Sequence, residues 1–171
     1  MRFQIPIWLG NLIELLGLVF GIFLILNLKI LPYYLQILAL FIAWFCFWYF
    51  SHCLAHFIVG KAFGLNFSYY FVGRSSITKL NSKFFAIFRY FPVLGIKVEP
   101  DSLKRISKKR KFIFYASGAI ASMSTPAISL LFAMQMDKIV FSIFLLLTFG
   151  NIAFTLIFSS KVGDLYKARV K

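Results

Sequence analysis

The residues most able to do chemistry in this chain are two histidines, His52 and His56, which stand four positions apart. On a helix this spacing places both imidazoles on one face, with their Cβ atoms about 6 Å apart. Two imidazoles so placed suit two ligands of one metal ion, above all zinc. The alternative is an ordinary pair of histidines that hydrogen-bond to neighbouring helices. Glu14 and Asp164 are the other ionisable groups that lie in or beside strongly apolar sequence.

The sequence around these groups has the composition of a membrane protein. It is 61% hydrophobic and 14% charged, with a mean hydropathy of +0.85. A soluble domain of 171 residues has too much surface to hide so many apolar side chains. Apolar runs of about 18 residues or more indicate membrane-spanning helices. The sequence therefore predicts a single all-α membrane domain over 1–171, with spans at about 5–28, 35–60, 112–134 and 139–160.

Basic residues are distributed very unevenly between the segments that join these runs. Segment 61–111, between the second and third spans, holds twelve of the nineteen Lys and Arg residues. Arg2 and four basic residues of the C-terminal tail fall on the same face, and only Lys29 and Lys138 fall on the opposite one. Cytoplasmic loops carry such an excess of positive charge. We therefore expect a multi-pass protein of the cell membrane with cytoplasmic N- and C-termini.

Segment 61–111 is predicted to be a basic cytoplasmic insert that contains short strands. Alternating residues favour strands at 67–72 and 95–99. Between them, 83–91 combines aromatic residues with positive charge, which is typical of a segment that lies among lipid headgroups. The run 103–111 adds six basic residues beside the third span, and an anionic leaflet attracts such a run. Membrane lipids with anionic headgroups are the expected partners, and no nucleic-acid-binding motif is present.

Residues Ser51 to Gly64, which contain His-Cys-Leu-Ala-His, resemble the zincin helix of intramembrane metalloproteases of the site-2 protease type. Those proteins carry His-Glu-x-x-His in a membrane helix, with a glycine about eight positions further on. Residues 116–122 are similar to the small-residue helix start that follows in the family. Residues 160–167, with Gly163-Asp164, resemble the closing Gly-Asp segment of uncharacterised membrane zincins with four spans.

The resemblance implies a zinc ion held by His52, His56 and Asp164, the aspartate being the third ligand in that pattern. The predicted topology agrees, because all three residues fall near the cytoplasmic face. Three protein ligands would leave the fourth position of zinc open. Asp164 follows Lys161 closely, so its carboxylate reaches the histidines only if the chain bends at Gly163. The alternative is an interfacial aspartate in a basic tail.

The chain departs from the family pattern at Cys53, which stands where the motif glutamate should be. In the family that glutamate is the general base that activates water, and a thiol does not replace it. Among the acidic residues only Glu14 could lie inside the bundle. Gly10, Gly17 and Gly21 share its helix face, so Glu14 is expected to face another helix. A structural role, a pairing with His52 or Lys61, and service as a substitute base stay open for it.

Three functions follow from this pattern. The first, and the one favoured, is a relative of the zinc metalloproteases without peptidase activity, which acts as a binding, regulatory or accessory protein and keeps the metal or only the fold. The second is an active intramembrane zinc metallopeptidase with an unusual base. The third is a structural subunit of a larger membrane complex that binds no metal and packs against other membrane proteins.

Overall fold

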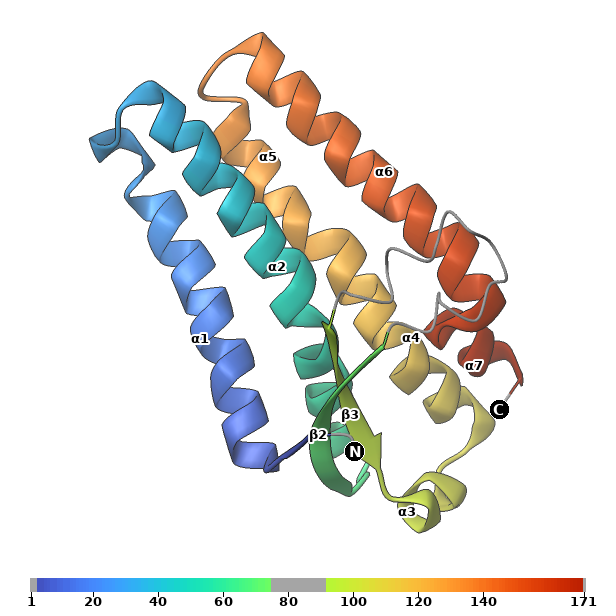
Figure 1. The fold of residues 1–171 in the computed structure, drawn as a ribbon. Helices are drawn as coiled ribbons and strands as arrows, with labels where there is room; N and C mark the ends of the chain where they lie inside the picture. Colours follow the sequence, from blue (N-terminus) through green and yellow to red (C-terminus); the bar gives the residue numbers. More distant parts are fainter. Residues whose placement is uncertain (1–2, 75–91, 171) are drawn as a thin grey trace.

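Four long apolar helical runs lie side by side in the computed structural model, which describes residues 3–74 and 92–170 (Figure 1). Each is long and apolar enough to cross a membrane, so the predicted helical architecture with four candidate spans is confirmed. The observed ends differ from the predicted ones by a few residues, mainly because polar residues extend the helices. The four runs are α1 (Ile7–Leu26), α2 (Tyr33–Ala62), the succession of α4 (Lys108–Ser124), η4 (Thr125–Ala127) and α5 (Ile128–Ala133), and α6 (Lys138–Val162).

Glycines on α1 allow this helix to approach α2 closely. The short helix η1 (Leu28–Ile30) joins the two helices. A Cβ atom at Gly17 would fall 2.2 Å from the ring of Phe50, and one at Gly21 would fall 3.1 Å from the Cβ of Cys46. Helices in apolar surroundings associate through such close packing of small residues. The prediction that this face of the first helix meets another helix is confirmed.

Apolar side chains from α2, α5 and α6 fill the part of the bundle remote from the strands. Leu40, Phe47 and Phe144 are each at most 3% exposed there. The indole of Trp44 donates a hydrogen bond to Thr148 Oγ1 at 3.0 Å, so the polar atoms of both residues are satisfied. This core joins α2 to α6 through side chains, while α6 packs closely against α4, α5 and α7.

The outward faces of the helices are apolar as well. Leu26, Leu146 and Phe149 are 72%, 73% and 62% exposed. Leaving a side chain of this size in water rather than burying it costs about 1.5–3 kcal/mol. Lipid removes that cost, and a helix satisfies its own backbone hydrogen bonds as a bilayer requires. The surface, like the helix lengths, is consistent with a multi-pass membrane protein.

A three-stranded antiparallel sheet covers one end of the bundle, in the order β1 (Gln4–Ile5), β2 (Phe67–Arg74), β3 (Pro92–Val98). The strands predicted at 67–72 and 95–99 are confirmed. The strand at Gln4–Ile5 was missed, because two residues are too few to show alternation. Tyr70 of β2 is fully buried against α1, where a Cβ atom at Gly10 would fall 2.2 Å from its ring. The predicted segment 83–91 lies outside the described residues.

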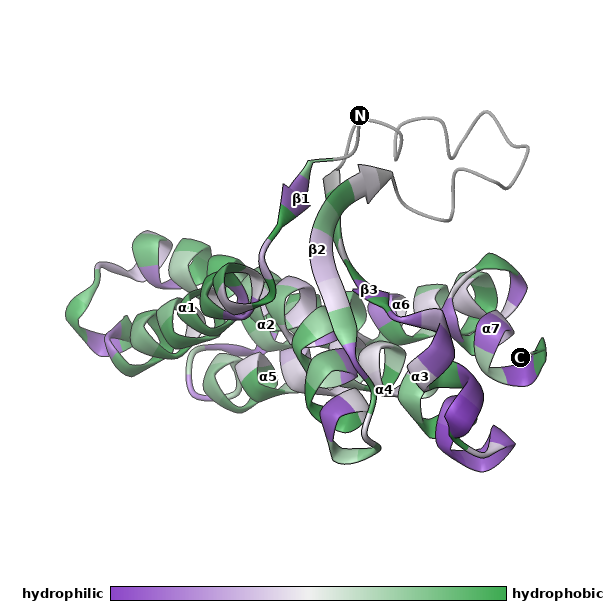
Figure 2. Ribbon diagram, turned by 90° about the horizontal axis from the view of Figure 1, so that it is seen from below, coloured by the Kyte–Doolittle hydropathy of each residue, from purple (hydrophilic) through white to green (hydrophobic). Residues whose placement is uncertain are grey.

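Polar sequence gathers at this same end, which we call the sheet end. Figure 2 shows hydrophilic residues on α3 (Pro100–Arg105), on the start of α4 and on α7 (Asp164–Val170). Ser107 caps α4 by accepting a hydrogen bond from the backbone N–H of Arg110 at 3.4 Å. Five basic side chains of the predicted run 103–111 are exposed on this surface: Lys104, Arg105, Lys108, Lys109 and Arg110.

Asp137 caps α6 at the opposite end of the bundle. Its Oδ1 accepts hydrogen bonds from the backbone N–H groups of Ile139 and Val140 at 2.8 and 2.9 Å, and the hydroxyl of Tyr33 donates to its Oδ2. The Tyr33 hydrogen bond, followed by the backbone hydrogen bonds, lowers the pKa of Asp137 from its usual value. The ionised form is therefore the one that the fold favours.

We expect Asp137→Asn to weaken the pH dependence of stability in the acid range. A carboxyl whose folded pKa is depressed stabilises the fold above its unfolded pKa, about 3.9, and that contribution is lost as the pH falls through the folded pKa. Asparagine is an equally good N-cap, so the two proteins should differ little at neutral pH. Thermal unfolding in detergent at neutral and acid pH measures this. Asp101→Asn, at an exposed carboxylate that pairs with Lys104, is the control, and an acid dependence equal in all three proteins would contradict the expectation.

Candidate metal centre

The length of α2 and a break after α6 bring the candidate ligands together at the sheet end. The 30 residues of α2 extend about 45 Å at 1.5 Å per residue, which exceeds the hydrocarbon thickness of about 30 Å, and His52 and His56 lie in its last turns. α6 ends at Val162, and Gly163 (φ −100°, ψ −150°) separates it from α7, which begins with Asp164. The predicted bend at Gly163 is therefore confirmed.

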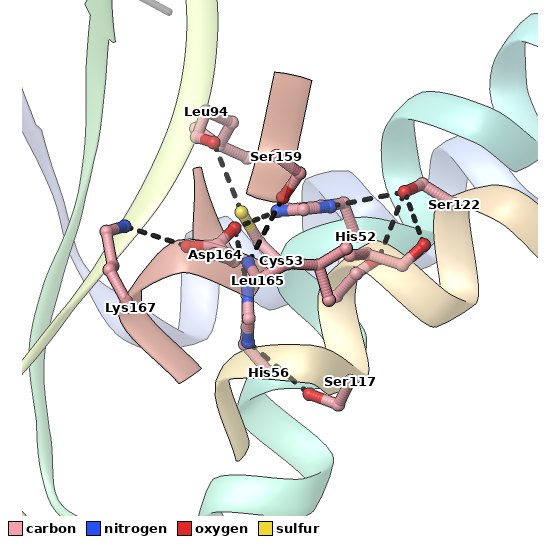
Figure 3. A network of polar contacts seen from close by, with 12 residues as sticks. His52, Cys53, His56, Leu94, Ser117, Ser122, Ser159, Asp164, Leu165 and Lys167 are labelled. Carbon is pink, nitrogen blue, oxygen red and sulfur yellow. Dashed lines mark hydrogen bonds and ion pairs between the residues drawn. The ribbon is translucent and has the colours of Figure 1, made fainter. Parts of the chain in front are cut away.

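The side chains of His52, His56 and Asp164 point toward one another (Figure 3). Asp164 Oδ2 lies 3.0 Å from His52 Nε2 and 3.4 Å from His56 Nε2. One ligand atom from each residue lies within 4.8 Å of the others, so the group could hold a metal ion. Ligand atoms bound about 2.0–2.1 Å from a tetrahedral zinc lie roughly 3.3 Å apart. The two nitrogen–oxygen distances are already close to this spacing.

Hydrogen bonds behind the rings determine which nitrogen faces the cluster. His56 Nδ1 is 2.8 Å from the carbonyl oxygen of Phe114, which only accepts, so Nδ1 carries the proton. His52 Nδ1 is 3.4 Å from Ser122 Oγ, and that hydroxyl donates to the carbonyl of Gly118 at 3.0 Å, which leaves its lone pairs for the ring. In their neutral forms both rings then direct the lone pair of Nε2 at a carboxylate. A ring in the other tautomer, with its proton on Nε2, donates to Asp164 Oδ2 instead, and without that proton Nε2 is free to bind a metal ion.

Asp164 is held in an orientation that leaves one oxygen for the cluster. Lys167 donates a hydrogen bond to Oδ1 at 2.7 Å, while Oδ2 faces the two histidines. Burial alone would raise the pKa of Asp164, but its hydrogen bonds to His52 and His56 hold that pKa well below its usual range. The carboxylate is thus ionised at neutral pH, as a metal ligand must be.

Gly118 of α4 makes room for His56. A Cβ atom at this position would fall 2.4 Å from His56 Nε2, closer than any side chain allows. Its neighbour Ser117 places Oγ 3.3 Å from His56 Nδ1. The resemblance had pointed to segment 116–122 only as a whole, and the contact with the histidine was not predicted. A glycine among small helical residues was the one available signal.

Cys53 lies on the neighbouring face of α2, where that helix meets β3 and the Glu14 side chain of α1. The Cys53 thiol is buried and donates to the carbonyl oxygen of Leu94 at 3.1 Å. Glu14 is 0% exposed, which confirms that it faces another helix, and its carboxyl lies beside the Cys53 thiol and Tyr70. Neither carboxyl oxygen has a hydrogen-bond partner among the described residues. A pairing of Glu14 with His52 or Lys61 is therefore not found.

No model of a known protein family, no curated protein and no solved structure matches the chain. The class is thus defined by fold and site alone. It is a bundle of four apolar helical runs with a small sheet at one end and a His–His–Asp group beneath it that could hold a metal ion. The relation to the site-2 protease type stays a prediction.

Proposed function

We propose that this chain is an integral membrane protein that binds one zinc ion through His52, His56 and Asp164 and is a relative of the intramembrane zinc metalloproteases. The observation that supports it is the convergence of three ligand atoms within 4.8 Å. Two imidazole nitrogens and one carboxylate oxygen are ordinary ligands of zinc and leave a fourth position open. When bound, the ion would supply Lewis-acid chemistry.

The proposed protein lacks peptidase activity. A general base must lie within hydrogen-bond reach of the proton it removes, and the residue at the motif position, Cys53, is buried and donates to Leu94. Glu14 of α1 lies beside that thiol, the backbone of Leu54 and Tyr70 rather than beside the histidines. A binding, regulatory or accessory role, in contact with other membrane subunits, is the function that suits a metal centre without a base.

The proposed orientation places the sheet end in the cytoplasm, with both termini. The exposed basic side chains of α3 and α4 support this, because cytoplasmic segments are enriched in Lys and Arg. Each such side chain near an anionic leaflet gains about 1 kcal/mol. Anionic lipid headgroups are therefore the proposed partners of this surface.

Metal analysis of the purified protein tests the proposal. We expect about one zinc per chain in the wild type and almost none in His52→Ala/His56→Ala, because the double variant keeps only the carboxylate. Cys53→Ser is the matched control and should keep its zinc, since the thiol faces Leu94. Asp164→Asn, which preserves the volume of the side chain, is the second variant should the double variant not fold. Equally low zinc in all four proteins after growth with added zinc would refute the metal site and favour the structural-subunit function.

A further inference from the structure

An apolar groove runs between α2 and α6, one helical turn from the candidate metal centre. Its volume is about 560 Å³, and Asn151 supplies the one side-chain amide of its lining. A Cβ atom at Gly150 would meet nothing within 4 Å, so this glycine borders open space. The residues that define the groove are Trp44 and Trp48 from α2 and Leu147, Gly150, Asn151 and Phe154 from α6.

The groove comes within one helical turn of the exposed edge of the His–His–Asp cluster. Trp48 and His52 are four residues apart on α2 and therefore share a helix face. At the same level Asn151 donates to the carbonyl oxygen of Ser122 at 2.8 Å, and Ser122 Oγ lies 3.4 Å from His52 Nδ1. The side chain of His52 is 30% exposed, whereas that of His56 is 7% exposed. A ligand that extends about one helical turn beyond the groove thus reaches the cluster at His52.

The size of the groove distinguishes between apolar ligands. A helix 10–12 Å in diameter with a pitch of 5.4 Å occupies on the order of 500 Å³ per turn. The groove would hold one turn of such a helix, which is far less than a membrane-spanning peptide. A single hydrocarbon chain is a better fit to an apolar slot, and the polar cluster at its end calls for a polar headgroup. Leu146, which also borders the groove, is 73% exposed, so a chain can enter sideways from lipid.

We propose that groove and cluster form one site for a membrane phospholipid, with an acyl chain between α2 and α6 and an anionic phosphate headgroup at the His52 edge of the metal centre. A zinc ion with two neutral imidazoles and one carboxylate keeps one positive charge, and Lys167 lies 2.7 Å from the same carboxylate. Both charges favour a phosphate in the fourth position. The headgroup half rests on the proposed zinc site, and the acyl-chain half does not.

Native mass spectrometry of the full chain, released from bilayers of equal parts phosphatidylcholine and phosphatidylglycerol, tests the site. We expect one retained lipid per wild-type chain, with phosphatidylglycerol in excess. Gly150→Trp should reduce the retained lipid about tenfold, because the indole fills the groove, which corresponds to roughly 1.4 kcal/mol of lost binding. Leu15→Trp is the control, since it adds an indole to a 52% exposed position on α1, and it should retain lipid. Gly150→Leu replaces Gly150→Trp if the larger residue prevents folding.

The outcomes separate this site from the zinc site, because zinc is measured on the same samples. Equal lipid retention in the groove variants and the wild type would overturn the site, as would an apolar peptide retained in place of lipid. A zinc-loaded wild type without preference for phosphatidylglycerol would overturn the headgroup half. If the wild type binds no zinc but its lipid retention falls in the Gly150 variants, the acyl-chain half is supported. The proposed metal function then fails on its own. Loss of the phosphatidylglycerol preference in His52→Ala/His56→Ala would support the headgroup half.

Discussion

Gly118→Ala is expected to lower zinc affinity about 100-fold or more, although Gly118 supplies no ligand atom. The added methyl group would lie 2.4 Å from His56 Nε2, so the imidazole must rotate away or α4 must retreat from α2. Either change removes the ligand or lengthens its bond. Disturbing the groups that orient a ligand typically costs 10–100-fold in metal affinity, and this change acts on the ligating nitrogen itself. Titration of zinc against a chromophoric chelator measures the loss.

The same substitution at Gly150 is the matched control. A Cβ atom there meets nothing within 4 Å, and Gly150 is not among the candidate ligands. Gly150→Ala should therefore bind zinc like the wild type, and both variants share the small gain in helix propensity of alanine over glycine. If Gly118→Ala binds zinc as tightly as the control, His56 is not a ligand in the arrangement described.

The candidate site could be predicted from the sequence only where spacing along one helix determines geometry. The four-residue interval between His52 and His56 specifies a shared face, and the structure has both rings there. Asp164 is 108 residues beyond His56, and no periodicity connects them. Its place in the cluster followed from a resemblance and from the bend required at Gly163. The contact of Gly118 with His56 depends on how α4 packs against α2, which local sequence does not reveal.

The fold shows the same division between local and tertiary information. Length and hydropathy were sufficient to predict the four apolar helical runs, because a helix that crosses a hydrocarbon layer must match its thickness and be apolar. Glycines on the face of Glu14 correctly indicated a helix contact, but not that Cys53 would be its neighbour. The two-residue strand at Gln4–Ile5 exists only because β2 offers it an edge, at Gln4↔Phe71 and Ile5↔Tyr70. Such a strand depends on its partner and leaves no pattern of its own.

The position of Glu14 changes how the missing motif glutamate should be restored. Cys53→Glu alone would place a second carboxyl against one that is fully buried and lacks a hydrogen-bond partner among the described residues. A buried polar group without a hydrogen-bond partner costs about 1–3 kcal/mol, and more if it is charged, so we expect this single variant to unfold at lower temperature or not to accumulate. The exchange Glu14→Cys with Cys53→Glu keeps one carboxyl and one thiol in nearly the same volume. It should recover most of the lost stability.

A double-mutant cycle over Glu14→Cys, Cys53→Glu and the exchange measures the coupling between the two positions. We expect a coupling energy within the range of about 0.5–3 kcal/mol seen for residues in contact. Additive effects would show that the two side chains do not interact.

The folded exchange variant also carries His-Glu-x-x-His on α2, so cleavage of a protein substrate can be assayed with and without a chelator. Chelator-sensitive cleavage that His52→Ala abolishes would mean that the base is the only missing part. A folded, zinc-loaded exchange variant without cleavage would mean that the helix bundle has also lost access for a peptide.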